Sequence, residues 1–466
     1  MSGIDIISDT TGQAIVESIK ALGTKLSEGR VIYGVHINGA DSNPKTRVRY
    51  LADAVGMTPA AMNFTSGTFD YGSWANAFFM PKPCMLKTNG QVDYYLNEND
   101  LTKKIDGGAS DVASIDYDGN AMMEWGNGTD IIWWKIEPDK GNPNSASLYV
   151  ANYQADKDFK NLNFIDINGN EKSHFYTPIY NGSLDSNNKL RSISGQTVIK
   201  SKTASQEMTY ARANGTGYEI EQYVDRLLIN ILLIIMGKST DTQDVFGRGM
   251  SENAGDENLL LETGTMNGKG LFWGENAGKA GVKVFGMENY YGNQWRRTVG
   301  LILANGTAKV KLSPSVKDGS SATNYNTDGT GYIEIPNSTP SGTSGGYIKD
   351  MLYTALGMFP TSITGSSSTY YPDGCWFNIA IIAFALFGGP LNDGRLCGAC
   401  SVSLHNVAGL AWIKNCDMYD YYREHIKPFI DFGKLKHKIS TVDRKARCIE
   451  YDRIQARRKH AIGQAA

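Results

Sequence analysis

Residues 218–237 read Tyr-Glu-Ile-Glu-Gln-Tyr-Val-Asp-Arg-Leu-Leu-Ile-Asn-Ile-Leu-Leu-Ile-Ile-Met-Gly and hold one of the two most apolar runs of this 466-residue chain. Apolar side chains recur there at the three- and four-residue spacing of a helix face. Ile229, Leu233 and Ile234 widen that face, so a helix here is buried on most sides. We therefore expect a helix over residues 218–236, ending at Gly237, that forms the spine of a hydrophobic core.

The rest of the sequence is typical of a turn-rich β protein. It contains 51 Gly, 25 Tyr and 8 Trp, and only 20% of the residues are charged. A coiled-coil rod or a disordered chain is richer in charge and poorer in aromatic residues. Residues 84–96 predict a β-hairpin, because two apolar flanks meet at Asn89-Gly90, where positive φ is tolerated. With a further helix expected over residues 203–213, the predicted fold class is α+β, mostly β.

Changes in pattern divide the chain into four segments. Residues 1–29 predict a short helix with a stripe of Ile15, Ile19, Leu22 and Leu26, which either packs on its own domain or mediates oligomerisation or attachment. Residues 30–159 predict a β-rich N-terminal domain. Residues 160–425 predict a second domain, with surface loops over 314–346 and strands joined by tight turns over 375–412. Residues 426–466 predict a basic helical tail.

The charge distribution restricts the partners that the chain is expected to have. The formal net charge is −2, so no strongly charged partner such as nucleic acid is implied. The tail differs, because its eleven basic and four acidic residues give it a net charge of +7. Three uses are open for such a tail: docking on an acidic surface, contact with nucleic acid, or staying mobile. The longest apolar runs, residues 227–236 and 379–387, are far shorter than the roughly 20 residues of a membrane span, so no membrane insertion is expected.

The termini and cysteines indicate the compartment in which the chain is made. The first residues, Met-Ser-Gly-Ile-Asp, lack the basic and apolar regions of a signal peptide, so synthesis in a cytoplasm is expected. Six cysteines at uneven spacing do not form a disulfide framework.

Two kinds of metal site were considered from ligand spacing. Cys397, Cys400, His405 and Cys416 have the side chains of a zinc site, but zinc sites usually pair two such elements at closer spacing. Residues 116–120 and 166–171 resemble fragments of calcium loops but lack the bidentate glutamate of the full motif, and both also fit hairpin turns. We expect no metal ion and no cofactor.

Recognisable catalytic motifs are missing from the sequence. It contains no phosphate-binding loop, no dinucleotide glycine fingerprint, no His-Glu-x-x-His and no Gly-x-Ser-x-Gly, and its six histidines are scattered. We therefore expect a protein that is not an enzyme. A scaffold rich in Tyr, Trp, Gly, Ser and Asn suits recognition of another surface, because the aromatic residues give rigid contact area and the small polar residues adapt to it.

Four stretches resemble one family, the tail-tip and tail-fibre receptor-binding proteins of bacteriophages that end in a C-type-lectin-like domain. The first stretch is residues 208–218 with the apolar helix after them, and the second is residues 287–300, Met-Glu-Asn-Tyr-Tyr-Gly-Asn-Gln-Trp-Arg-Arg-Thr-Val-Gly. The third is residues 344–348 with residues 369–374, and the fourth is residues 388–394 with Gly398 and the loop before Trp412. Their order and spacing agree with the family over roughly residues 160–420. The resemblance implies a lectin-like fold, which the formylglycine-generating enzymes share, for residues 160–425.

The fourth stretch is also similar to the variable region written by diversity-generating retroelements. In those proteins a rigid lectin-like fold presents side chains that change freely. The resemblance implies that Gly388, Gly389, Gly394 and Gly398 are scaffold positions where only glycine fits the backbone. It implies a ligand-binding surface formed by Leu391, Asn392, Asp393, Arg395, Leu396, Ser401, Ser403, His405, Asn406, Leu410 and Trp412.

The resemblance implies a homotrimeric virion protein of a phage tail, made in the host cytoplasm, that binds a host surface receptor and other tail proteins. The receptor is either a protein or a glycan. Two departures are present: no Arg-x-Ala-x-Arg follows the cysteines as in the formylglycine-generating enzymes, and residues 415–423 replace the usual closing strand. Two alternatives stay open, a structural virion protein (baseplate or head decoration) that uses the fold for packing, and an enzyme acting on surface glycan.

Overall fold

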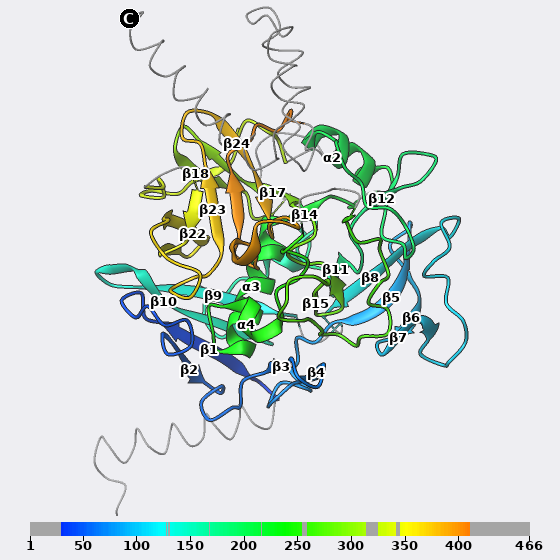
Figure 1. The fold of residues 1–466 in the computed structure, drawn as a ribbon, viewed down its shortest axis with the longest axis horizontal. Coiled ribbons are helices and arrows are strands. Elements are labelled where there is room, and N and C mark those ends of the chain that lie inside the picture. Colours follow the sequence, from blue (N-terminus) through cyan, green and yellow to red (C-terminus); the bar gives the residue numbers. More distant parts are fainter. Residues whose placement is uncertain are drawn as a thin grey trace, which may run out of the picture.

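The computed structural model describes residues 29–410, except 127, 129–130, 167, 216, 254–258, 314–324 and 342–344. The predicted N-terminal helix, the basic tail, Trp412 and Cys416 lie outside these residues. Strands dominate the described chain, so the prediction of a mostly β protein is confirmed at that level (Figure 1). Among the residues described, no helix is long and apolar enough to cross a membrane.

Three α-helices lie in the middle of the described chain: α2 (Ala204–Arg212), α3 (Tyr223–Gly237) and α4 (Thr242–Phe246). Helix α2 agrees with the prediction, and Thr203 and Gln206 form a capping box at its start. Helix α3 begins at Tyr223 rather than Tyr218. The reason is that Glu221–Gln222 form strand β14, which pairs in parallel with Thr298 and Val299. Two 3-10 turns are present as well, η1 (Leu162–Phe164) and η3 (Gly394–Leu396).

The early part of the chain forms three antiparallel sheets. The four-stranded sheet contains, in order, β2 (Val48–Ala52), β1 (Ile32–Ile37), β10 (Asn142–Ala151) and β9 (Trp133–Asp139). The five-stranded sheet contains β11 (Phe175–Pro178), β8 (Gly119–Trp125), β5 (Lys82–Lys87), β6 (Val92–Asn97) and β7 (Asp100–Lys104). Strands β3 (Ala61–Asn63) and β4 (Thr68–Asp70) form a pair. The hairpin β5–β6 confirms the prediction for residues 84–96, with Gly90 at φ +82° in its turn.

The later part of the chain forms one large sheet and three hairpins. The large sheet contains β19 (Ile333–Glu334), β18 (Thr307–Val310), β17 (Arg296–Ala304), β24 (Ile382–Phe387), β25 (Val402–Leu404), β23 (Gly374–Phe377) and β20 (Gly345–Tyr347), with β14 beside β17. The hairpins are β12 (Ser183–Leu184) with β13 (Leu190–Arg191), β15 (Lys283–Val284) with β16 (Met287–Glu288), and β21 (Asp350–Thr354) with β22 (Gly357–Ser362). Strands joined by tight turns were predicted over residues 375–412, and β23, β24 and β25 agree with this over the described part.

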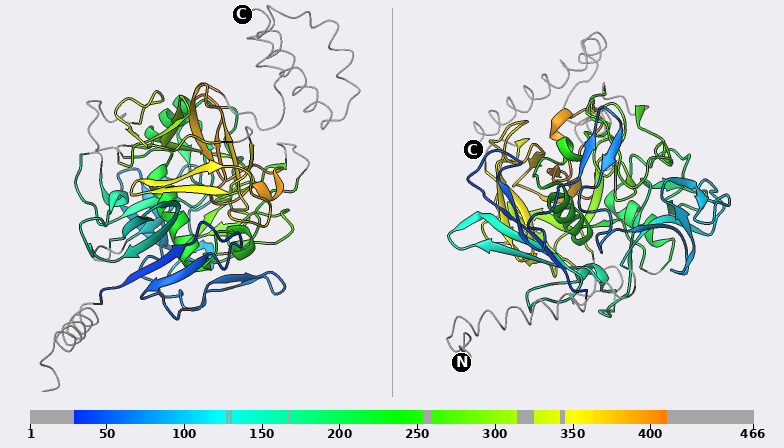
Figure 2. Two further views of the ribbon diagram at one scale, coloured as in Figure 1. Left: turned by 90° about the vertical axis from the view of Figure 1, so that its left-hand side faces the viewer. Right: turned by 90° about the horizontal axis from the view of Figure 1, so that it is seen from below.

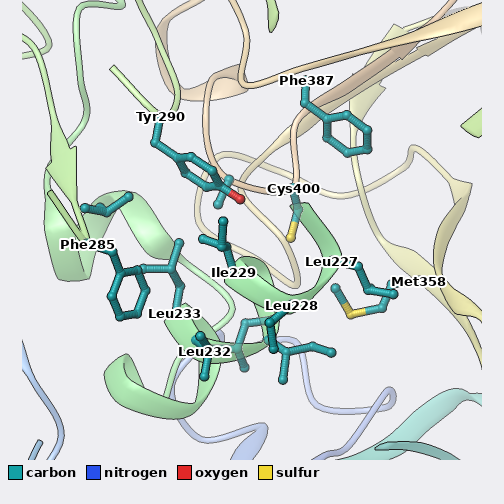
Figure 3. Packing of buried hydrophobic residues seen from close by; sticks show 14 of the residues in the cluster. Leu227, Leu228, Ile229, Leu232, Leu233, Phe285, Tyr290, Met358, Phe387 and Cys400 are labelled. Atoms are coloured by element: carbon teal, nitrogen blue, oxygen red, sulfur yellow. The ribbon is translucent and has the colours of Figure 1, made fainter. Parts of the chain in front are cut away.

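Helix α3 occupies the centre of the molecule (Figure 1). It packs against β1 and β10 of the four-stranded sheet and against β17 of the large sheet. In the left-hand view of Figure 2 the dark-blue strands lie below the yellow and orange strands. Figure 3 shows Leu227 facing Met358, while Leu233 lies beside Phe285. The predicted spine of the core is therefore confirmed.

One hydrophobic cluster reaches across the predicted boundary at residue 159. It runs from Val35 to Leu404 and includes residues of both predicted domains. Strand β11, which follows the boundary, pairs with β8, which precedes it. The division into two domains, residues 30–159 and 160–425, stays a prediction. In the structure these two segments share a sheet and a hydrophobic core.

Candidate ligand-binding surface

The structure corrects the expected exposure of three predicted surface residues. Leu391 and Ser401 are fully buried and Ser403 is 3% exposed. Ser403 lies on β25 between Trp376 of β23 and Leu386 of β24, so neighbouring strands flank it on both sides. Ser401 accepts a backbone hydrogen bond from Gly388, and Leu391 accepts one from Asn253. In this conformation the three side chains contribute to packing rather than to a ligand surface.

The other described candidates separate into two groups at opposite ends of β25. Asn392 is exposed, and Asp393, Arg395 and Leu396 are half-buried, in the loop that leads from β24 into β25. The second group, which follows β25, contains exposed His405 and half-buried Asn406 and Leu410. The structure thus assembles one compact loop surface, residues 392–396, and does not bring all predicted residues together.

Glycines fix the backbone of the loop as predicted. Gly388, Gly389, Gly394 and Gly398 have φ of +93°, +77°, +59° and +153°, conformations that L residues with a Cβ rarely adopt. A Cβ on Gly389 would lie 2.8 Å from Cys397 Sγ, and one on Gly398 would overlap Oδ1 of Asp373. At Gly394 only Glu252 is near, at 3.4 Å. The predicted scaffold role of these glycines is therefore confirmed by their backbone geometry.

Asp373 anchors the loop from below. Its Oδ2 accepts a hydrogen bond from the backbone N–H of Cys400 at 2.8 Å, and its Oδ1 accepts one from Gln243 Nε2 at 3.3 Å. The residue is fully buried, and burial raises the pKa of this carboxyl to about 8. The carboxyl is therefore protonated over most of the physiological pH range.

Helix α3 holds the same loop from the core side. The carbonyl oxygen of Ala399 accepts hydrogen bonds from Asn230 Nδ2 at 3.0 Å and from Arg226 Nη2 at 3.3 Å. Arg226 also donates to the carbonyl of Tyr290 at 2.9 Å, and its guanidinium lies 3.9 Å from the centre of the Tyr290 ring. Two polar side chains of an otherwise apolar helix thus set the position of the candidate loop.

Arg395 connects the loop to helix α4. Its guanidinium forms ion pairs with Asp241, which caps α4, and with Asp244 at 2.9 Å. Its Nε also donates to the carbonyl of Ser367 at 3.1 Å. Arg395 was predicted to contact a ligand, but most of its donors are used within the chain. Its first role in this structure is to hold the loop.

Several neighbours of the loop were missed from the sequence. Arg248 and Glu252 form an ion pair, and Ser251 accepts the backbone N–H of Gly394. Tyr347 of β20 and Trp376 of β23 are half-buried on the strands next to the loop. Contacts between segments that are separated in the sequence bring these residues to residues 392–396, and no local motif signals them.

The cavity below the sheet is too small to hold a ligand. It has a volume of about 20 Å³ and lies between α3, β17, β25 and the hairpin β21–β22, with Asn230, Met358 and Phe387 among its lining. One water needs about 10–15 Å³ by a comparable measure.

The cysteines of the considered zinc set serve the packing of the loop. Cys397 Sγ donates to the carbonyl of Pro390 at 2.8 Å, and burial raises the pKa of the Cys400 thiol. Within the described ranges, no three His, Cys, Asp or Glu side chains are placed to hold a metal ion. In the calcium-like fragment at residues 166–171, Asp166 accepts the backbone N–H groups of Asn168 and Asn170, as in a turn.

Comparison with known proteins adds no identification to this geometry. No family model matches the chain, and no curated protein sequence matches it. The assignment to a family rests on the four sequence stretches, and any function assigned through it is a proposal.

A pair of glycine substitutions tests the framework of the loop. Gly394→Ala adds a methyl group that makes only an ordinary contact with Glu252, at positive φ, which costs about 1–2 kcal/mol of folding free energy. Gly398→Ala adds the same methyl group against the Asp373 carboxyl, so it is expected to lower the free energy of unfolding by clearly more. Urea denaturation of both variants measures the difference. Equal losses would contradict the proposed contact between Gly398 and Asp373.

The buried Asp373 carboxyl predicts a pH dependence of stability. Its pKa rises from 3.8 to about 8 on folding, so between these values the native state holds a proton that the unfolded state releases. Its contribution is complete below about pH 4 and is lost as pH rises through about 8, by up to about 1.4 kcal/mol per pH unit. We expect wild-type stability to fall relative to Asp373→Asn between pH 5 and 8 in urea denaturation. Parallel pH profiles for the two proteins would show that Asp373 is ionised in the native state.

Proposed function

We propose that this chain is a receptor-binding protein of a bacteriophage tail, with a C-type-lectin-like domain that binds its ligand through residues 392–396. One observation carries the proposal: the backbone of this loop is fixed by glycines, Asp373 and α3, while Asn392 faces solvent and Asp393 and Leu396 are half-buried beside it. Such a loop can change its outer side chains at little cost to folding.

The four stretches that resemble the family contact one another in the structure, and this supports the proposal. Tyr290 of the second stretch donates to Asn230 of α3 at 3.0 Å. Gly292 of the second stretch donates to the carbonyl of Gly388 in the fourth, and Asp373 of the third accepts the backbone N–H of Cys400, which follows Gly398 of the fourth. Segments separated by long sequence distances therefore form one continuous unit around α3, as expected of motifs that define a domain.

A homotrimer on the virion and a variable region written by a retroelement are parts of the same proposal. Several copies on one particle would raise the overall affinity of individually weak contacts. The host surface receptor and other tail proteins are the proposed partners. The proposed variable positions exclude the buried residues Leu391, Ser401 and Ser403. They are the outer residues of the loop and the group after β25.

A structural virion protein remains a second candidate, and one observation favours it. Ile379, Ile382 and Val407 are exposed by 51%, 37% and 46%. They lie at the end of the large sheet where Asn406 pairs with Phe384, away from residues 392–396. Exposed aliphatic side chains of this kind suit packing against another protein.

Binding to bacterial cells tests the proposed receptor function. We expect the fluorescently labelled protein to bind a subset of strains in a panel, and the triple variant Asn392→Ala, Asp393→Ala, Leu396→Ala to bind at least about tenfold more weakly. The matched control replaces exposed Arg49 and Glu137 of the four-stranded sheet and Lys140 of its β9–β10 turn with Ala, and keeps the binding. If both triple variants bind like the wild type, or the wild type binds no strain, the loop is not a receptor site.

The nucleotide sequence beside the gene tests the proposed diversification. We expect an imperfect repeat of the segment that encodes residues 375–415, differing only at adenines of the template copy, next to a reverse transcriptase gene. The differing codons should include those of Asn392, Asp393 and Leu396 and spare those of the four glycines. A flanking sequence without such a repeat would remove diversification from the proposal and leave a fixed surface, for adhesion or for packing.

A further inference from the structure

A flat aromatic surface lies beside the candidate loop. The indole of Trp376 lies across two glycines of adjacent strands, since a Cβ on Gly345 would come within 2.6 Å of it and one on Gly374 would overlap its other end. Neither glycine has a positive φ, so the backbone conformation does not require glycine at these positions. The space that the indole occupies does require it. Trp295 meets the indole edge-on, at 5.4 Å between ring centres. Because the two glycines have no side chains, the half-buried indole lies flat against the backbones of the two strands.

Tyr347 extends this surface toward the loop. It is the cross-strand neighbour of Gly374 and lies on the same strand face as Gly345, two residues away. Gly374 in turn borders the loop, because a Cβ there would lie 3.0 Å from the carbonyl oxygen of Leu396. Tyr347 therefore lies beside Trp376 on the part of the sheet that borders residues 392–396.

The charges around this aromatic surface are largely compensated. The Arg395 guanidinium is paired with Asp241 and Asp244, and the Arg248 guanidinium is paired with Glu252. Asp393 adds a further carboxylate at the loop. A strongly anionic ligand, such as a phosphorylated, sulfated or sialylated glycan, would meet carboxylates and only guanidinium groups that already have partners, and it is disfavoured for that reason.

We propose that the ligand of this surface is a neutral saccharide that stacks on Trp376 and Tyr347 and hydrogen-bonds to Asn392 and Asp393. The inference rests on the proposed function, since it assigns a ligand class to the same surface. The C–H face of a neutral sugar ring is apolar and flat, so it packs on aromatic rings. Its hydroxyl groups are both donors and acceptors, which the carboxamide of Asn392 and the carboxylate of Asp393 in the neighbouring loop can satisfy.

The test is binding of the full-length protein to immobilised neutral, sialylated and sulfated oligosaccharides, followed by titration of the best neutral one. We expect binding to neutral oligosaccharides, and a loss of at least about tenfold in affinity for Trp376→Ala and for Tyr347→Ala. Gly374→Ala, which keeps the tryptophan and displaces it, should also weaken binding. Tyr149→Ala is the matched control, because Tyr149 likewise covers a glycine, Gly34, on a distant sheet. Thermal unfolding identifies any variant that fails to fold.

Cell binding separates failure of this inference from failure of the proposed function. If cells bind the protein, but binding is abolished by protease treatment of the cells and unaffected by Trp376→Ala, the receptor function stands and the saccharide inference is overturned. Binding to sialylated or sulfated glycans alone overturns it as well. If the protein binds neutral saccharide but no cell, the inference stands and the host-attachment function fails.

Discussion

Burial of helix α3 is the constraint on which the rest of this structure depends. All its residues except Asp225 are buried, and eight of them are Leu or Ile, each contributing roughly 1.5–3 kcal/mol when removed from water. A helix that is apolar on every side cannot be covered by one sheet. It is enclosed here by β1 and β10 from the early part of the chain and by β17 from the later part. The single core that spans both predicted domains follows from this requirement.

Two polar residues of α3 connect the core to the candidate surface by hydrogen bonds. A buried arginine and a buried asparagine need hydrogen-bond partners, because leaving such groups unpaired costs several kcal/mol. Arg226 and Asn230 both find the carbonyl of Ala399, directly after the loop. The same helix that holds the fold together therefore also holds the backbone at the end of this loop.

Features decided within a short stretch of chain could be predicted from the sequence. Helix α2 with its cap at Thr203, the hairpin β5–β6 and the four loop glycines depend on local periodicity or on backbone conformation. The start of α3 could not be predicted in the same way, because Glu221 is drawn into β14 by its partner Thr298, distant in sequence. Leu391 and Ser403 were misplaced because tertiary contacts decide their burial. Ser403 lies between β23 and β24, and Leu391 lies in the turn after β24, against Asn253.

The aromatic side of the surface was beyond sequence reasoning because it is built from separated strands. The pairing of β20 with β23 is what brings together Gly345, Gly374 and Trp376. The polar anchors below the loop have a comparable origin, since Asp373 meets Cys400 and Gln243 through tertiary structure alone. A polar anchor is directional, so it fixes the loop in one position more strictly than apolar contacts would. Such an anchor would let the proposed binding surface keep its shape even where its outer side chains differ.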